Sequence, residues 1–316
     1  MSYSSSVKNQ LSRIECKTCC SKAELAAIIA TAGVFNFNNG LTVKFLTENA
    51  ALARRFLSEI KSAYKYYPKI SARKNSRLKK RMSYIITMTS ASDAHVILKS
   101  LGIDLATVEE SNIATAVFGS EIDKLLKEEC CRRAFLRGAF LAGGSVSDPE
   151  KAYHLEITGR HRDIIQKIAN IMAGYGLNGK IVRRKENYVV YLKEGENIVD
   201  FLNIIGAHKA LLEIENIRIL KEMRNSVNRM VNCETANLDK TVDASVRQID
   251  NIKLLEKQIG LNNIPKALAE VAVLRKKHPD ATLRELGQKM DPPLGKSGVS
   301  HRLIKLEEIA EQLKRS

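Results

Sequence analysis

The side chains most capable of chemistry in this sequence are its six cysteines, which could bind a metal ion or undergo redox reactions. Cys16 and Cys19 have the C-x-x-C spacing that is typical of zinc and redox sites. A structural zinc site needs four ligands, and no second C-x-x-C or C-x-x-H follows at zinc-finger spacing. Zinc ligation and a redox thiol stay open as alternatives. We interpret the cysteines as small buried residues and expect neither a metal nor another cofactor.

Two pairs of adjacent cysteines mark an internal repeat. Cys19-Cys20-x-x-Ala23-x-Leu25 recurs 111 positions later as Cys130-Cys131-x-x-Ala134-x-Leu136, and Gly33 recurs as Gly144 at the same offset. Extra residues around 74–81 of the first copy then reduce the offset to 104. We therefore predict two copies of one structural unit, at about 19–103 and 130–207.

The elements that must position these residues follow the order αββαββα in each copy. An apolar helix opens the copy, a hairpin and an amphipathic helix follow, and a second hairpin and a short helix close it. Two such units can form one continuous sheet around a pseudo-two-fold axis, within an α+β domain spanning 1–225. For the first copy we expect a helix at 21–32, strands at 34–38, 41–47, 69–73 and 83–89, and a last helix ending at Gly102; for the second, a helix at 129–143, strands at 145–146, 153–158, 179–184 and 188–193, and a last helix ending at Gly206.

The opening helices, LAAIIATAG at 25–33 and LRGAFLAGG at 136–144, resemble the LAGLIDADG motif of homing endonucleases. Their small residues suit two helices that approach closely on a symmetry axis. The resemblance implies that an acidic residue should precede the last glycine, so that paired carboxylates bind the divalent ions that cleave DNA. Ala32 and Gly143 hold these positions here. We therefore expect a degenerate scaffold that is not an enzyme.

Two other interpretations of these helices stay open. They could be ordinary buried apolar helices, unrelated to nucleases. Alternatively, the chain could be a metal-dependent DNA endonuclease that uses displaced acids. The nearest acids are Glu24, before the first motif, and Asp148, beyond the second.

The charge of the chain favours a polyanionic partner. The sequence has 51 Lys and Arg against 35 Asp and Glu, a net charge of +16. It has neither an apolar run of membrane-spanning length nor an N-terminal signal core, so we expect a cytoplasmic, nucleoid-associated protein without a membrane partner. Basic residues concentrate in the second hairpin of each copy, where they could contact phosphates or simply form solvated loops: Arg73, Lys74, Arg77, Lys79, Lys80 and Arg81, and then Arg183, Arg184 and Lys185.

The C-terminal part predicts an all-α domain at 244–316, after a polar linker at 226–243. A helix at 244–259 is expected first. Three more follow, from Pro265 to about Lys277, from a capping box of Thr282 with Glu285, and from an N-cap at Ser297 to about Leu313. The last helix has a polar face, as in a helix-turn-helix whose third helix enters the major groove. The alternative is a helical module that binds protein. The expected DNA-binding residues are Thr282, Arg284, Lys296, Ser297, Ser300, His301, Arg302 and Lys305.

The whole sequence resembles the WhiA family of bacterial transcriptional regulators. The resemblance is most specific in CCSKAELAAIIATAG, FLRGAFLAGGSVSDP and LRELGQKMDPPLGKSGVSHRLIKLEEIA. It implies sequence-specific binding to double-stranded DNA and roles in cell division, chromosome segregation and sporulation. A protein co-regulator is a further expected partner, and no small-molecule substrate is expected. The remaining alternative to a regulator or an endonuclease is a scaffold that binds other proteins.

Overall fold

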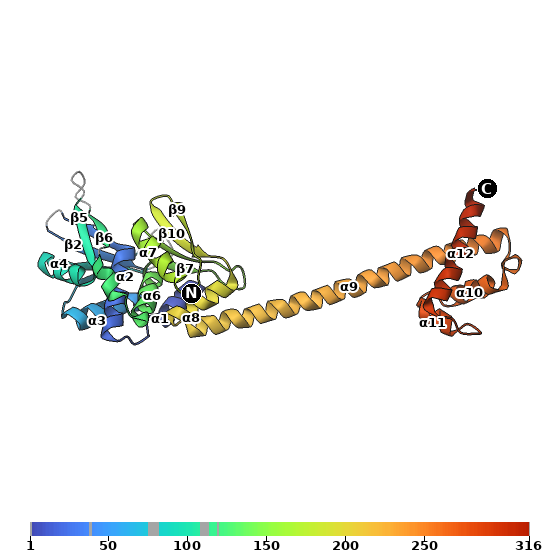
Figure 1. Cartoon of the computed structure of the whole chain (residues 1–316), viewed down its shortest axis with the longest axis horizontal. Coiled ribbons are helices and arrows are strands. Elements are labelled where there is room, and N and C mark those ends of the chain that lie inside the picture. The colour runs from blue at the N-terminus through green and yellow to red at the C-terminus, as the bar shows by residue number, and fades with distance from the viewer. Residues whose placement is uncertain (1, 38–39, 75–81, 108–113, 119, 316) are drawn as a thin grey trace. The chain divides into compact units, whose positions relative to one another are not determined.

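A computed structural model describes residues 2–37, 40–74, 82–107, 114–118 and 120–315 (Figure 1). The chain divides into two compact units, Met1–Leu220 and Lys221–Ser316. Arg77, Lys79, Lys80 and Arg81, four of the expected phosphate contacts, lie outside the described residues.

The N-terminal unit contains the predicted repeat. Its two central helices both have 15 residues, and their bounds differ by the same 111 positions that separate the cysteine pairs. The elements of the first copy are α2 (Thr18–Ala32), β1 (Gly33–Asn36), β2 (Thr42–Thr47), α3 (Ala50–Tyr64), β3 (Lys69–Lys74), β4 (Met82–Met88) and α4 (Ala91–Ser100). Those of the second are α6 (Glu129–Gly143), β7 (Gly144–Val146), β8 (Leu155–Gly159), α7 (Arg162–Ala173), β9 (Lys180–Arg184), β10 (Asn187–Leu192) and α8 (Gly195–Ile205).

The prediction of one continuous sheet is wrong. Each copy forms its own four-stranded antiparallel sheet, in the order β1-β2-β4-β3 and β7-β8-β10-β9. The identical strand order supports the repeat. Helices α2 and α6 fill the boundary between the copies, so packed helices rather than a backbone ladder join them.

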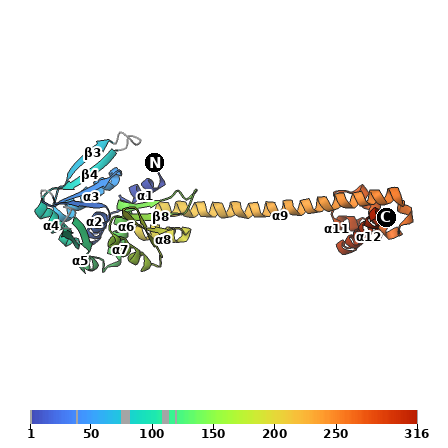
Figure 2. The same ribbon diagram turned by 90° about the horizontal axis from the view of Figure 1, so that it is seen from above.

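The two central helices lie side by side between the sheets (Figures 1 and 2). A Cβ atom at Gly138 of α6 would lie 2.4 Å from the backbone oxygen of Glu24 and 3.0 Å from Cβ of Ala27. The helices can therefore approach this closely only because residue 138 has no side chain. Leu25, Ile28 and Phe140 are fully buried here, at the centre of the core of the unit.

Several elements of the N-terminal unit are not predicted by the sequence analysis. Helix α1 (Tyr3–Leu11) has an N-cap at Ser2 and buries Val7 and Leu11, which are four residues apart. Between the two copies lie a hairpin and a short helix: β5 (Ile103–Thr107), β6 (Ala114–Phe118) and α5 (Ser120–Leu125).

Helix α9 (His208–Gln258) continues through the segment expected to be a non-helical linker. Residues 226–243 contain neither proline nor glycine, so nothing in their backbone chemistry interrupts the helix. Among the residues that the structure describes, no helix combines the length and hydrophobicity that a membrane crossing needs.

The C-terminal unit is helical, as predicted. After α9 come η1 (Leu261–Asn263), α10 (Lys266–Lys277), α11 (Leu283–Gln288) and α12 (Lys296–Arg315). Ile252 and Leu255 of α9 pack with Val271 of α10, Leu286 of α11 and Val299 of α12 in a separate core.

Candidate nucleic-acid interface

The two positions at which the endonuclease motif would have carboxylates are the last residues of α2 and α6. Neither Ala32 nor Gly143 has a side-chain oxygen that could bind a metal ion. A Cβ atom at Gly143 would lie 2.1 Å from the backbone oxygen of Thr158 and 2.8 Å from Cγ2 of Thr31. In this backbone conformation there is therefore no space for an acidic side chain at position 143.

The displaced acid Glu24 is fully buried and engaged by two arginines. Nε of Arg137 donates to its Oε2 over 2.7 Å, and Nη2 of Arg55 donates to the same oxygen over 3.0 Å. Nε of Arg55 donates to the other oxygen, Oε1. Both carboxylate oxygens thus have charge-assisted hydrogen bonds that a metal ion would have to displace.

The second displaced acid, Asp148, lies in the turn between β7 and β8. Its Oδ1 accepts a hydrogen bond over 3.0 Å from the backbone N–H of Glu150, which is a common role of aspartate in turns. The two displaced acids therefore occupy structural positions, one as the centre of an ionic network and one in a turn.

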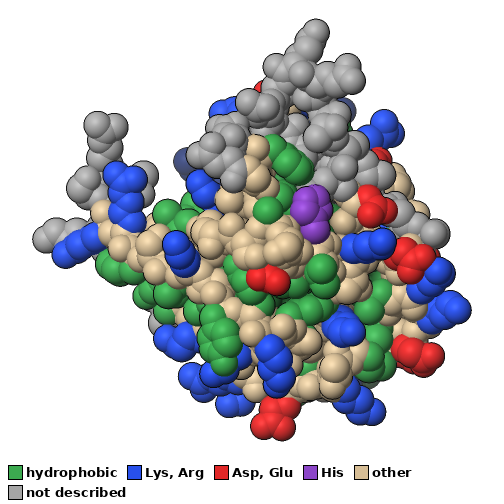
Figure 3. Space-filling view, turned by 90° about the vertical axis from the view of Figure 1, so that its left-hand side faces the viewer, with side chains coloured by type: hydrophobic (Ala, Val, Ile, Leu, Met, Phe, Trp, Pro, Cys, Tyr) green, Lys and Arg blue, Asp and Glu red, His purple; other side chains and the backbone are tan. Residues whose placement is uncertain are grey.

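The described basic residues of the second hairpins lie at the ends of β3 and β9. Arg73, Lys74, Arg183 and Lys185 are exposed, and Lys185 forms the turn in a left-handed conformation with φ of 53°. Arg184 is also exposed, but its Nη1 lies 2.8 Å from Oε2 of Glu156. Lys and Arg predominate over acidic side chains on the face of this unit that Figure 3 draws. The equivalent hairpins thus present exposed positive charge in both copies.

The capping box expected at the start of α11 is present. The hydroxyl of Thr282 accepts from the backbone N–H of Glu285 over 3.3 Å, and Oε2 of Glu285 accepts from the N–H of Thr282 over 2.8 Å. That backbone hydrogen bond lowers the pKa of Glu285 below its usual value. Thr282 therefore uses its side chain to cap the helix, while Arg284 in the first turn is exposed.

The connection between α11 and α12 is set by Gly287. A Cβ atom there would lie 2.0 Å from the backbone oxygen of Leu294, whose N–H donates to the oxygen of Gly287 over 2.9 Å. Helix α12 begins at Lys296, and the oxygen of Gly295 accepts from Val299 over 3.2 Å. Ser297 therefore lies in the first turn and is not the N-cap residue that the sequence analysis expects.

The polar face of α12 is directed away from the core of the C-terminal unit. Lys296, Ser297, His301 and Lys305 are exposed, and Ser300 is half-buried. The opposite face is the buried stripe Val299, Leu303, Leu306 and Ala310. The structure thus brings most of the expected DNA-binding residues to one helix surface.

Arg302 differs from its neighbours on α12. Its Nη1 donates to the backbone oxygen of Ala267 over 3.2 Å and lies 3.8 Å from Oε2 of Glu270, both on α10. These contacts hold the guanidinium against α10. Arg302 therefore supports the position of α12, and His301 and Lys305 are the freer donors beside it.

Domains of one family match most of the chain. The WhiA N-terminal LAGLIDADG-like domain matches residues 18–104, the WhiA LAGLIDADG-like domain matches 132–224, and the WhiA C-terminal HTH domain matches 227–310. The chain belongs to the WhiA family.

Full-length relatives agree with this assignment to the WhiA family. A "Probable cell division protein WhiA" of Alkaliphilus metalliredigens is 51% identical over 315 residues, which cover 99% of this chain and 98% of the relative. A protein of the same name from Ruminiclostridium cellulolyticum is 49% identical, with 100% and 99% covered. The crystal structure of full-length DUF199/WhiA from Thermatoga maritima is 26% identical, covers 99% of both chains, and has a TM-score of 0.60. The predicted α+β fold with a C-terminal helix-turn-helix is confirmed.

The sequence analysis missed three residues that shape these surfaces. Arg55 and Arg137 neutralise Glu24, and Gly287 permits the connection into α12. One signal for Arg137 was available, because this arginine interrupts an apolar helix at the position where the first copy has Ala26. Gly287 offered no such signal, because the backbone that packs against it belongs to Leu294, seven residues later in the sequence.

Proposed function

We propose that this protein is a sequence-specific, DNA-binding transcriptional regulator that acts in cell division and does not cleave DNA. The single observation that carries the proposal is the free polar face of α12, with Lys296, Ser297, His301 and Lys305 exposed on one side of a well-packed helix. Lysine and histidine donors and a serine hydroxyl on a helix can read base edges and bind phosphates in the major groove. The helix-turn-helix assignment of 227–310 supports this use.

The N-terminal unit contributes phosphate contacts in this proposal. Arg73, Lys74, Arg183 and Lys185 stand at equivalent hairpins of two similar sheets, so they suit the repeating charge of a duplex backbone. Phosphate contacts orient a protein on DNA without reading its sequence. The C-terminal unit therefore supplies specificity and the N-terminal unit supplies additional affinity.

The absence of nuclease activity is supported by the chemistry of the centre. Ala32 and Gly143 supply no ligand, and Glu24 is committed to Arg55 and Arg137. Two-metal cleavage of DNA needs carboxylates that are free to bind the ions. The alternative, an endonuclease that uses Glu24 or Asp148, would require these hydrogen bonds to be broken first.

We infer the cellular role of the chain from its relatives. Curated proteins that are about half identical over their full length carry the name of a probable cell division protein. We assign the chain the same process, with chromosome segregation and, in sporulating lineages, sporulation as the transcriptional programmes that it affects. Its place in the cell is then the cytoplasm, on the nucleoid, and a protein co-regulator is a second partner beside DNA.

An in vitro selection tests the proposal. The full chain is incubated with a library of randomised duplexes at near-physiological salt, and bound duplexes are recovered, amplified and sequenced. The proposal expects one enriched motif, which disappears when His301 and Lys305 are both changed to Ala. A selection that enriches no motif, or a motif that survives the double substitution, contradicts it.

The same enriched duplex then tests the endonuclease alternative. The duplex is incubated with the protein and Mg²⁺ or Mn²⁺, and the products are separated by denaturing electrophoresis. Intact strands are expected. Specific cleavage that is lost in Glu24→Gln or Asp148→Asn would establish the nuclease instead.

A further inference from the structure

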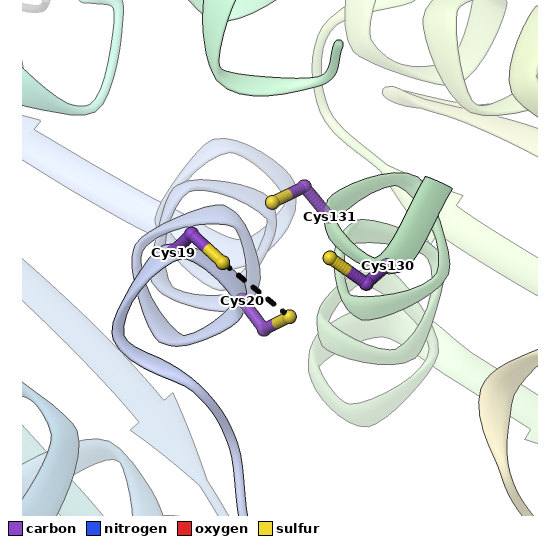
Figure 4. A group of neighbouring side chains, drawn as sticks. All are labelled: Cys19, Cys20, Cys130 and Cys131. Carbon is purple, nitrogen blue, oxygen red and sulfur yellow. Dashed lines mark hydrogen bonds between the residues drawn. The ribbon is translucent and has the colours of Figure 1, made fainter. Parts of the chain in front are cut away.

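Four cysteines that are far apart in the sequence meet at the N-terminal ends of the two central helices. Cys19 and Cys20 come from α2, and Cys130 and Cys131 come from α6 (Figure 4). Their four Sγ atoms all lie within 4.8 Å of one another. The sequence analysis considered Cys16 and Cys19 as a ligand pair. In the structure, the packing of the two repeats instead places Cys19 beside Cys20, Cys130 and Cys131.

The dimensions of this cluster suit a single ion with four sulfur ligands. A tetrahedral zinc site with Zn–S bonds of about 2.3 Å has sulfur atoms about 3.8 Å apart. The Sγ atoms of Cys19 and Cys20 are 3.9 Å apart. A set of four such atoms therefore needs only small rotations of its side chains to surround one ion.

The helix ends around the cluster favour negative charge on sulfur. All four cysteines lie in the first turn of α2 or α6, where free backbone N–H groups and the helix dipole stabilise thiolates. Although burial acts to raise the pKa of Cys19, hydrogen bonds from Cys131, Cys20 and Cys130 lower it overall. Burial, together with the neighbouring thiols, raises the pKa of Cys20 to about 12 and also raises the pKa of Cys131. Without a cation the two buried thiols therefore stay protonated, and their ionisation depends on a cation bound between the four sulfur atoms.

Two of the four cysteines are exposed to solvent and the other two are buried in the core. Cys19 and Cys130 are exposed, which gives an ion a path of entry, whereas Cys20 and Cys131 are buried between the helices. Ala32 lies 13 positions after Cys19 in α2, which is about 20 Å along the helix axis. The cluster is therefore separate from the former nuclease centre at the other end of the helices.

A second group of possible ligands, Cys16, Glu24 and Glu59, does not fit an ion equally well. Nη2 atoms of both Arg55 and Arg137 lie 3.0 Å from Sγ of Cys16, and both arginines also bind Glu24. Two guanidinium groups already supply the positive charge there. Among the described residues, no lysine, arginine or histidine side chain forms a hydrogen bond or ion pair with the four-cysteine cluster.

We propose that Cys19, Cys20, Cys130 and Cys131 bind one soft divalent metal ion of the zinc type, which links the two repeats at the start of α2 and α6. Each thiol releases its proton to solvent as its sulfur bonds to the metal, so that four thiolates surround a dication. Sulfur-only, tetrahedral coordination selects zinc over magnesium or calcium. The ion is structural, because no coordination position is left for a substrate or water.

Metal analysis of the full chain tests the site. The protein is purified under reducing conditions without chelator, and its zinc is measured by inductively coupled plasma mass spectrometry. About one zinc ion per chain is expected in the wild type and in Cys233→Ser, which changes an exposed cysteine of α9. Cys19→Ser/Cys130→Ser changes only exposed positions, so folding should persist while the zinc is lost.

Cobalt identifies the ligands independently. Titration of Co²⁺ into metal-free protein should give the intense visible bands of tetrahedral cobalt and a sulfur-to-cobalt charge-transfer band, saturating at one equivalent. Zn²⁺ should abolish these bands, and they should be absent in the double variant. Wild-type protein that holds no zinc and gives no such bands overturns the proposal.

Discussion

Glu24 and Arg137 form an ion pair, 2.7 Å long, that joins the two halves of the repeated domain across its centre. Glu24 is fully buried and the side chain of Arg137 is 9% exposed, so neither charge is solvated by bulk water. The pair lies between the two helices that would carry the metal-binding carboxylates in an active endonuclease. An arginine brought from the second copy thus neutralises a carboxylate of the first, which ties the copies together.

Substitution of Arg137 by Ala should destabilise the N-terminal unit by about 3–5 kcal/mol, because it leaves a buried carboxylate with only Arg55 as its partner. Hydrogen exchange of the α2 and α6 amides in the full chain, measured by mass spectrometry, would report this change. Arg184→Ala is the control, since it removes the exposed partner of Glu156 and should cost about 0–1 kcal/mol. Equal effects of the two substitutions would contradict the role given to the buried pair.

Glu59 should give the N-terminal unit a distinctive dependence on pH. Burial, followed by the nearby charge of Glu24, raises the pKa of Glu59 from 4.5 to about 8. Because the folded state holds this proton more tightly than the unfolded state, the stabilisation is complete below pH 4.5 and is lost as the pH rises to about 8. Glu59→Gln mimics the protonated form, so it should become more stable relative to wild type across this window.

Urea unfolding of the full chain at several pH values, monitored through hydrogen exchange of the α3 amides, checks this difference in stability. Glu150→Gln changes an exposed acid and provides the control. A stability difference between Glu59→Gln and wild type that stays constant over the window would show that Glu59 does not titrate as described.

Gly287 should be essential to the helix-turn-helix. Its substitution by Ala places a Cβ atom 2.0 Å from the backbone oxygen of Leu294, so the connection into α12 must move. We expect the affinity for a selected duplex to fall at least tenfold, measured by fluorescence anisotropy. Gly295→Ser is the matched control in the same connection: a Cβ atom there meets nothing within 4 Å, and serine is favoured at a helix N-cap. A Gly287→Ala variant that binds as tightly as Gly295→Ser would refute the assigned constraint.

The basic hairpins should contribute to affinity through phosphates alone. Arg73→Ala/Arg183→Ala should weaken binding to selected and unrelated duplexes by similar factors and reduce the salt dependence of binding, by about 0.9 in the logarithmic slope for each lost phosphate contact. Lys61→Ala/Lys99→Ala removes the same charge from exposed positions on helices α3 and α4. If salt titrations give both variants the same logarithmic slope of affinity against salt, the N-terminal unit is not part of the DNA interface.

Local signals allowed much of the fold to be predicted. The repeat of the cysteine pairs and of Gly33 with Gly144 predicted both central helices, because a recurring pattern doubles the information at each position. The capping box at Thr282 likewise predicted the start of α11. The middle of α9 was wrongly predicted to be a linker, since this polar segment lacks the apolar periodicity by which a packed helix is recognised.

The parts that sequence could not supply are contacts between distant residues. Cys19 meets Cys130 and Cys131 only through the packing of α2 against α6, so the spacing of Cys16 and Cys19 suggested a different ligand set. Arg302 was predicted to face DNA, but its contacts with Ala267 and Glu270 depend on how α10 lies beside α12. Such relationships follow from tertiary packing, which a local pattern does not encode.

The central claim is that α12 reads DNA sequence while the repeated domain does not, and one ratio tests it most directly. The affinity of the full chain for a selected duplex is divided by its affinity for a scrambled duplex at fixed salt. We predict that His301→Ala/Lys305→Ala lowers the free-energy difference that corresponds to this ratio by about 1–3 kcal/mol for each base contact that is lost, whereas Arg73→Ala/Arg183→Ala leaves it unchanged. A ratio that survives the α12 substitutions, or that collapses only when the hairpin arginines are removed, would contradict the account.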